Sequence, residues 1–178
     1  ACAGVRRASE ILYKGLCDLE YRGYDSAGIS VKRGGEIVTV KRAGRVSAIE
    51  CARRLGGSAG IGHTRWATHG RPSDENAHPH CRGGFSVVHN GIIENYAVLK
   101  EELIAEGDEF LSQTDSEVVV HLLAKYYRGD LKEAVLRTVA RLKGAFALCI
   151  LHEDFEGFVA VKYRNPVIVG CGNGCFAA

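Results

Sequence analysis

Apolar side chains recur at helical spacing near the start of the chain. Ile11, Leu12, Leu16 and Leu19 fall on one side of a helix, so the pattern predicts a helix over residues 9–19. Similar apolar stripes, most of them ended by a glycine, predict further helices over residues 47–55, 94–106, 114–128 and 130–143.

Between the helices, short apolar runs indicate strands. Residues 29–31 and 37–40 form a pair joined by a turn at Gly34-Gly35. Other runs predict strands over residues 61–64, 85–88, 145–151, 158–161 and 167–170. The order is a helix, strands, helices and strands again. It favours an α+β fold in which helices pack outside antiparallel sheets, rather than a parallel sheet.

The segment Thr114-Asp115-Ser116-Glu117 has the pattern of a capping box. Thr114 is expected to cap the helix and Glu117 to reach back to it. Asp115 would then lie in the first turn. An acid is favoured there by helix electrostatics alone, so its position does not by itself indicate a binding role.

The bulk composition describes one domain with a sizeable core and excludes several classes of protein. The chain has 178 residues and is 46% apolar. A net charge of +2 without a long basic run argues against nucleic-acid binding, and no apolar run reaches membrane-spanning length. Seven unevenly spaced cysteines favour reduced thiols in the cytoplasm, and without a CxxC pair no structural zinc is expected. Packing is the role expected for Cys17, Cys51, Cys149, Cys171 and Cys175.

The most informative segment runs from His63 to Gly70 and continues through Asn76-Ala77-His78-Pro79-His80. It is too polar to be justified by core packing, which indicates a binding site. Arg65 could grip a carboxylate with its planar fork, or it could form a surface salt bridge. Trp66 could equally be a core aromatic or the wall of a pocket. The histidine spacing does not match a helical zinc motif, so no metal is expected.

Asn90-Gly91 follows the strand expected at residues 85–88, and two interpretations are open. The pair is common in hairpin turns. It could also form an oxyanion hole, in which an amide side chain and a backbone N–H point at one oxygen.

In these motifs the chain resembles the glutamine amidotransferase domain of the glutamine–fructose-6-phosphate transaminases (isomerizing), a branch of the class II amidotransferases. The resemblance runs from about Ile11 to Ala178. It is carried by residues 19–28, 63–70, 76–80, 88–96 and 114–117, all in family order. Class II relatives in purine synthesis tend to carry HRGQDSAG in place of residues 21–28 and a tyrosine in place of Trp66.

The resemblance implies a fold and a reaction. The fold is the four-layer α/β/β/α sandwich of N-terminal-nucleophile hydrolases, and the reaction is hydrolysis of L-glutamine to glutamate and ammonia. The ammonia would serve glucosamine-6-phosphate synthesis from fructose-6-phosphate in attached sugar isomerase domains. It further implies a cytoplasmic enzyme, without a cofactor, that is a homodimer when full length.

The resemblance also assigns roles to single residues. Arg65 would bind the substrate carboxylate, and Asp115 would bind the α-amino group together with Gly91. Asn90 and Gly91 would form the oxyanion hole. The remaining implied site residues are Trp66, Thr68 and His69 in the pocket, and Arg22, Asp25 and Ser26 as its structural support.

The family's nucleophile is a cysteine at the first position, whose own α-amine serves as base. Here the chain opens Ala1-Cys2, and Cys2 lies nine residues before Ile11, whereas the family's cysteine lies about fourteen before it. Either the nucleophile lies upstream of Ala1 and Cys2 is a bystander, or Cys2 is a shifted nucleophile that requires removal of Ala1. We expect the first, with the domain incomplete at both ends. Two alternatives for the whole domain are an inactive glutamine-binding regulatory module and an amidotransferase that serves another acceptor.

Overall fold

Two antiparallel sheets form the centre of the structure, a computed structural model that describes residues 1–4, 7–66, 70–172 and 175–178. The larger sheet has the order β3 (Glu36–Ala43), β2 (Ser26–Arg33), β4 (Ala59–Arg65), β1 (Cys2–Ala3), β10 (Cys175–Ala177) and β9 (Gly170–Gly172). The smaller sheet has the order β5 (His80–Arg82), β6 (Phe85–Ile93), β7 (Gly144–His152) and β8 (Val159–Tyr163).

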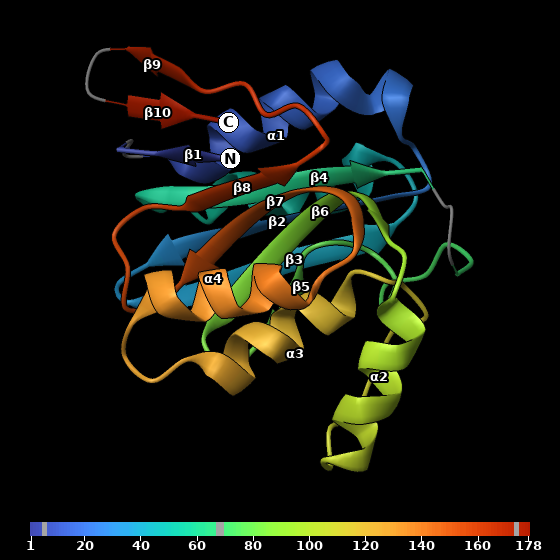
Figure 1. Ribbon diagram of the computed structural model, residues 1–178. Helices are drawn as coiled ribbons and strands as arrows, with labels where there is room; N and C mark the ends of the chain where they lie inside the picture. Colours follow the sequence, from blue (N-terminus) through green and yellow to red (C-terminus); the bar gives the residue numbers. More distant parts are fainter. Residues whose placement is uncertain (5–6, 67–69, 173–174) are drawn as a thin grey trace.

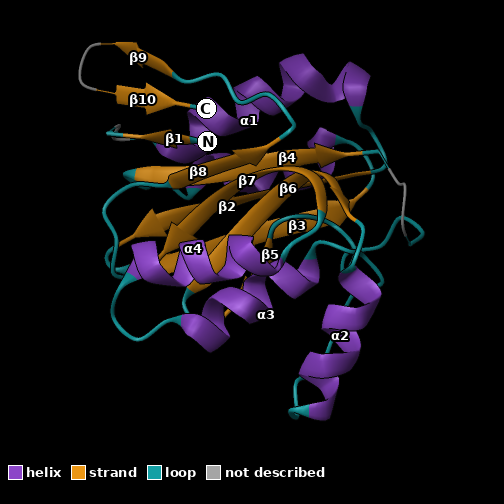
Figure 2. Ribbon diagram, in the orientation of Figure 1, coloured by secondary structure: helices purple, strands orange, loops and turns teal. Residues whose placement is uncertain are grey.

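Helices cover the outer faces of both sheets (Figure 1). On the larger sheet lie α1 (Ala8–Leu19), which runs into the short 3-10 helix η1 (Glu20–Arg22), and the 3-10 helix η2 (Val46–Arg54). On the smaller sheet lie α3 (Glu117–Tyr126) and α4 (Leu131–Arg141), while α2 (Tyr96–Ala105) projects from one end. Figure 2 shows the resulting order of helices, sheet, sheet and helices, which confirms the expected four-layer α+β fold.

Three apolar layers hold the two sheets and their helices together. One lies between each sheet and the helices that cover it, and the third lies between the two sheets. The layer under α1 contains Leu12 and Ile29, and the layer under α3 and α4 contains Leu122 and Phe146. Among the described residues, the buried apolar cluster between the sheets consists of Ala59, Ile61, Val88 and Leu151, with a few partly buried apolar residues packed against it. Polar side chains share that middle space, where Ser86 donates to Ser30 over 2.7 Å.

Two expected elements differ from the structure. Residues 46–54 form a 3-10 helix instead of an α-helix, with non-helical dihedral angles at Ile49. The strand expected over residues 167–170 begins only at Gly170, where β9 pairs with β10. Ile168 and Val169 are 85% and 61% exposed, so their apolar character does not reflect burial in a sheet.

The capping box expected at Thr114 is also wrong, because its side chains have other partners. Thr114 is hydrogen-bonded to His80 over 3.1 Å, and the Glu117 carboxylate accepts from the backbone N–H groups of Leu111 and Ser112. The N-cap is Ser116, and α3 begins at Glu117.

No helix in the described ranges is long and apolar enough to span a membrane.

Candidate active site

A pocket of about 450 Å³ opens where β4 of the larger sheet faces β6 of the smaller sheet. It gathers six of the residues expected from the sequence, which come from four separate parts of the chain: Arg22, Arg65, Trp66, Asn90, Gly91 and Asp115. Two others, Thr68 and His69, lie outside the described residues.

Arg65 ends β4 and is only 5% exposed. Its guanidinium donates to the carbonyl of Gly70 over 3.0 Å. The expected supporting residues lie beside it: Ser26 is its register partner on β2, and the backbone N–H of Asp25 donates to its carbonyl. The cationic side chain thus lies on the wall of the pocket, where it can contact an anionic group of a ligand.

Asp115 supplies the opposite charge and is also 5% exposed. It immediately precedes the N-cap Ser116 rather than lying in the first turn of α3, and it lines the pocket. Its Oδ2 accepts the backbone N–H of Ile93 over 2.8 Å, and its Oδ1 accepts the hydroxyl of Ser116 over 3.2 Å. These bonds fix the carboxylate at the pocket wall.

Asn90 and Gly91 lie within β6, paired with Ala147 and Phe146 of β7, so the hairpin-turn interpretation is wrong. Gly91 has φ +130°, and a Cβ there would come within 2.1 Å of the Ala145 carbonyl. Only glycine fits this position. The strand therefore places an amide side chain and a strained backbone unit side by side on the pocket wall.

Aromatic side chains stand at the rim. Trp66 is 60% exposed and packs edge-on against Tyr24, with ring centroids 5.5 Å apart. Trp66 is therefore a wall of the pocket and not a core aromatic. Arg22 also lines the pocket, with its Nε donating to the hydroxyl of Tyr21.

Cys2 does not line this pocket. It is 3% exposed in the layer under α1, where its thiol donates weakly to the carbonyl of Ala8 over 3.7 Å. Burial raises the pKa of this thiol, which disfavours the thiolate needed for nucleophilic attack. The structure thus separates Cys2 from every other expected site residue that it describes.

The packing role expected for the other cysteines holds for Cys149, which packs against the cluster between the sheets, but exposure contradicts it for three of them. Cys17, Cys51 and Cys171 are exposed, and Cys149 and Cys175 are half-buried.

Histidines with little exposure line the pocket or lie next to it: His63 and His78 line it, and His80 adjoins them. The rings of His63 and His78 are 4.5 Å apart, and those of His78 and His80 are 4.8 Å apart. Burial lowers the pKa of His63 to about 4 and that of His80 to about 3, with the nearby Arg65 also favouring the neutral form of both. Within the described ranges, no group of three or more His, Cys, Asp or Glu side chains is placed to hold a metal ion.

These buried histidines predict loss of stability in mild acid. The folded pKa values of His63 and His80 lie below the unfolded value of 6.5, so the unfolded chain takes up protons first as the pH falls. Their stabilisation is complete above pH 6.5 and is lost on acidification toward about pH 4 for His63 and about pH 3 for His80. We expect the free energy of unfolding to fall by about 2 kcal/mol per histidine between pH 7 and pH 5.

Urea denaturation at several pH values measures this slope. The variant His80→Gln should show a smaller dependence of the unfolding free energy on pH, because the contribution from protonation of His80, about one proton, is removed. An unchanged slope would show that His80 is protonated equally in both states.

Three residues at the site were not identified from the sequence. Ser116 contacts Asp115, His89 contacts Ser116, and Asn165 donates from Nδ2 to the Asn90 carbonyl over 3.0 Å. No local pattern pairs Asn165 with a residue 75 positions away.

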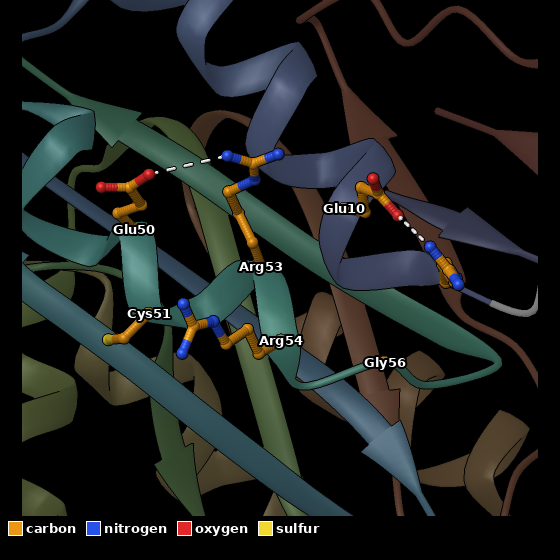
Figure 3. Close-up of a pocket in the computed structure, with 7 residues that line it drawn as sticks. Glu10, Glu50, Cys51, Arg53, Arg54 and Gly56 are labelled. Atoms are coloured by element: carbon orange, nitrogen blue, oxygen red, sulfur yellow. Dashed lines mark hydrogen bonds and ion pairs between the residues drawn. The ribbon is translucent and has the colours of Figure 1, made fainter.

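A wider hollow of about 800 Å³ lies between the start of α1 and η2 (Figure 3). Its charged groups largely pair with each other, Arg7 with Glu10 at 3.2 Å and Arg53 with Glu50 at 3.6 Å. None of the expected site residues lines it, so the pocket between the sheets is the better candidate.

Comparison with known proteins places the chain among relatives of one kind. The model of the glutamine amidotransferase domain family matches residues 63–169. The chain is 51% identical over 176 residues to a glutamine–fructose-6-phosphate aminotransferase [isomerizing] of Thermus thermophilus. The match covers 96% of this chain and 29% of that relative. The corresponding protein of Aquifex aeolicus is 53% identical over 176 residues, covering 94% and 29%. The chain thus spans less than a third of the length of these curated relatives.

Among solved structures, the glutamine phosphoribosylpyrophosphate amidotransferase of B. subtilis superposes with a TM-score of 0.86 at 28% identity. The match covers 98% of this chain and 40% of that one.

Proposed function

Because the chain belongs to the glutamine amidotransferase domain family, we propose that the pocket between its sheets binds L-glutamine and hydrolyses it to glutamate and ammonia. The observation that carries the proposal is the pair of opposite charges on the pocket wall, Arg65 and Asp115, each 5% exposed. An amino acid presents one carboxylate and one ammonium group, and the two buried side chains match them.

The register of β1 indicates where the nucleophile belongs. Cys2 pairs with Gly60 in an antiparallel register, so the residue five positions before Cys2 would pair with Arg65, five positions after Gly60. In the described chain, no strand pairs with residues 61–65 on this edge of β4. A strand that continued β1 along this edge would bring its fourth residue before Ala1 to the pocket. That position is fourteen residues before Ile11, the spacing expected for the family's nucleophilic cysteine.

The alternation of side chains along β1 supports the same position. Ala1 and Ala3 pack between the sheets, whereas Cys2 faces α1. Successive side chains of a strand point to opposite faces, so the fourth residue before Ala1 would share the face of Ala1 and point into the space between the sheets. We propose that this residue is the nucleophile and that Cys2 is a packing residue.

The proposed chemistry follows from these positions. The thiolate forms a bond to the side-chain carbonyl carbon of glutamine, and the former thiol proton leaves with the ammonia when the C–N bond breaks. Asn90 and Gly91 stabilise the oxyanion of the tetrahedral intermediate. Water then cleaves the thioester, which releases glutamate and restores the thiol.

The test compares three chains. The first carries residues 1–178 behind a four-residue segment, Cys-Gly-Ile-Val, with a free α-amine. The second begins with alanine in place of that cysteine, and the third combines the first segment with Cys2→Ala. We expect glutamine hydrolysis, and labelling of the first residue by a glutamine-like electrophile, in the first and third chains only.

Labelling of Cys2, or hydrolysis by the second chain, would contradict the proposal. If the first chain binds glutamine without hydrolysing it, the domain is a glutamine-binding regulatory module.

In the longer protein, we propose that the ammonia is passed to attached sugar isomerase domains for glucosamine-6-phosphate synthesis. The proposal rests on about 50% identity with the fructose-6-phosphate relatives, against 28% with the phosphoribosylpyrophosphate amidotransferase. A homodimeric assembly and a cytoplasmic location belong to the same proposal and rest on the family resemblance.

A further inference from the structure

Three side chains that line the pocket form a hydrogen-bonded chain with little exposure to solvent. His89 Nδ1 lies 2.8 Å from Ser116 Oγ, and Ser116 Oγ lies 3.2 Å from Asp115 Oδ1. All three are at most 5% exposed. His89 comes from β6 and the other two from the segment before α3, so the bonds join the sheet to the loop that carries Asp115.

The direction of these bonds follows from the number of protons available. A hydroxyl has one proton, and Ser116 donates it to the Asp115 carboxylate. Ser116 must then accept from His89, so His89 carries its proton on Nδ1. Burial lowers the pKa of His89 and the Asp115 carboxylate opposes this effect. The neutral imidazole with its proton on Nδ1 already donates the hydrogen bond that Ser116 accepts.

We propose that Ser116 and His89 are positioning residues that hold the Asp115 carboxylate in the orientation that receives the α-ammonium group of the substrate. This inference rests on the proposed function, since it assigns the recognition of one group of glutamine.

Each oxygen of the Asp115 carboxylate accepts a hydrogen bond from a different donor in the protein. Oδ2 is held by the backbone N–H of Ile93 and Oδ1 by Ser116, one bond to each oxygen. Each oxygen has a second lone pair that can accept a hydrogen bond from the ligand. Without Ser116, Oδ1 loses its hydrogen bond, and the carboxylate can rotate while Oδ2 stays bonded to the N–H of Ile93. The negative charge is then no longer held in one position.

The test measures binding by calorimetry, so it does not depend on the nucleophile. Each variant is made in the chain that carries the four-residue segment beginning with alanine, and is titrated with L-glutamine and with glutaramate, which has the same carboxylate and amide but no α-amino group. We expect Ser116→Ala and His89→Leu to lower the preference for glutamine by about tenfold through weaker glutamine binding, with the Kd for glutaramate unchanged.

Two further variants act as controls. His89→Asn presents a side-chain N–H close to the position of Nδ1 and should restore the preference. Ser112→Ala removes another buried hydroxyl from the same loop, one that is bonded to Thr114 and not to Asp115, and should leave the preference unchanged.

An unchanged preference in Ser116→Ala would overturn the inference, as would an equal loss of affinity for both ligands. If the unsubstituted chain binds glutamine and the variants discriminate as well as it does, only the positioning role fails. If the unsubstituted chain binds neither ligand, the proposed function itself fails.

Discussion

Arg65→Met is expected to raise the Kd for L-glutamine by about a hundredfold or more. Arg65 is 5% exposed, so the proposed contact with the ligand's carboxylate would form where water competes poorly. Truncating one member of a buried charge pair costs about 2–5 kcal/mol, and about 3 kcal/mol corresponds to a hundredfold in Kd. Arg65→Lys keeps the charge but loses the planar fork, so we expect an intermediate loss. Calorimetric titration of the three chains measures the order.

A matched control separates recognition from net charge. Arg54→Met removes an arginine that lines the hollow of Figure 3 and does not line the pocket, and it should leave the Kd unchanged. Thermal unfolding of each variant checks that the fold survives loss of the bond from Arg65 to Gly70. A folded Arg65→Met chain with nearly normal affinity would place the carboxylate elsewhere.

Gly28→Ala is expected to destabilise the fold by about 3 kcal/mol or more, although it adds a single methyl group. Gly28 lies in the middle of β2, where the segment at His78-Pro79 crosses the sheet closely. A Cβ at this position would come within 2.1 Å of the His78 carbonyl and 2.6 Å of the Lys41 Cβ. Neither neighbour is the flexible end of a side chain, so backbone must move.

Urea denaturation measures the difference, and Gly15→Ala is its control. Gly15 lies inside α1 with no atom within 4 Å of the added Cβ, so the same change there should stabilise the chain by about 0.5–1 kcal/mol. If Gly28→Ala unfolds at the same urea concentration as the unsubstituted chain, the 78–79 segment can move away from the sheet at little cost.

The sequence predicted the elements whose burial follows a regular period. On α1 the helix is confirmed but the stripe is only partly correct: Leu12 and Leu16 cover one face of the larger sheet, whereas Ile11 and Leu19 are 49% and 47% exposed. The same reasoning does not distinguish a 3-10 helix from an α-helix over nine residues, as η2 shows. Apolar residues near Ile168 are exposed, and composition alone carries no sign of that.

At the site, residue types could be predicted but hydrogen-bond partners could not. Arg65, Asn90, Gly91 and Asp115 all line one pocket, as the motifs indicated. The partner of Ser116 lies 27 residues away in the sequence, and only the fold brings it close. The position of Cys2 depends on which face of β1 it occupies, and a two-residue strand shows no period from which to infer a face.

The division of the structure into three apolar layers has a consequence for the order of folding. Strands β2, β3 and β4 form their sheet, and its helical cover, almost entirely from residues 8–65, while the smaller sheet and its helices come from residues 80–163. Each half therefore builds its core from neighbours in sequence, which lowers the entropy cost of closing the chain. The docking of two preformed halves, across a small and partly polar contact, would then be the late step. The pocket that we propose binds glutamine lies on that seam, so it would be completed only when the halves meet.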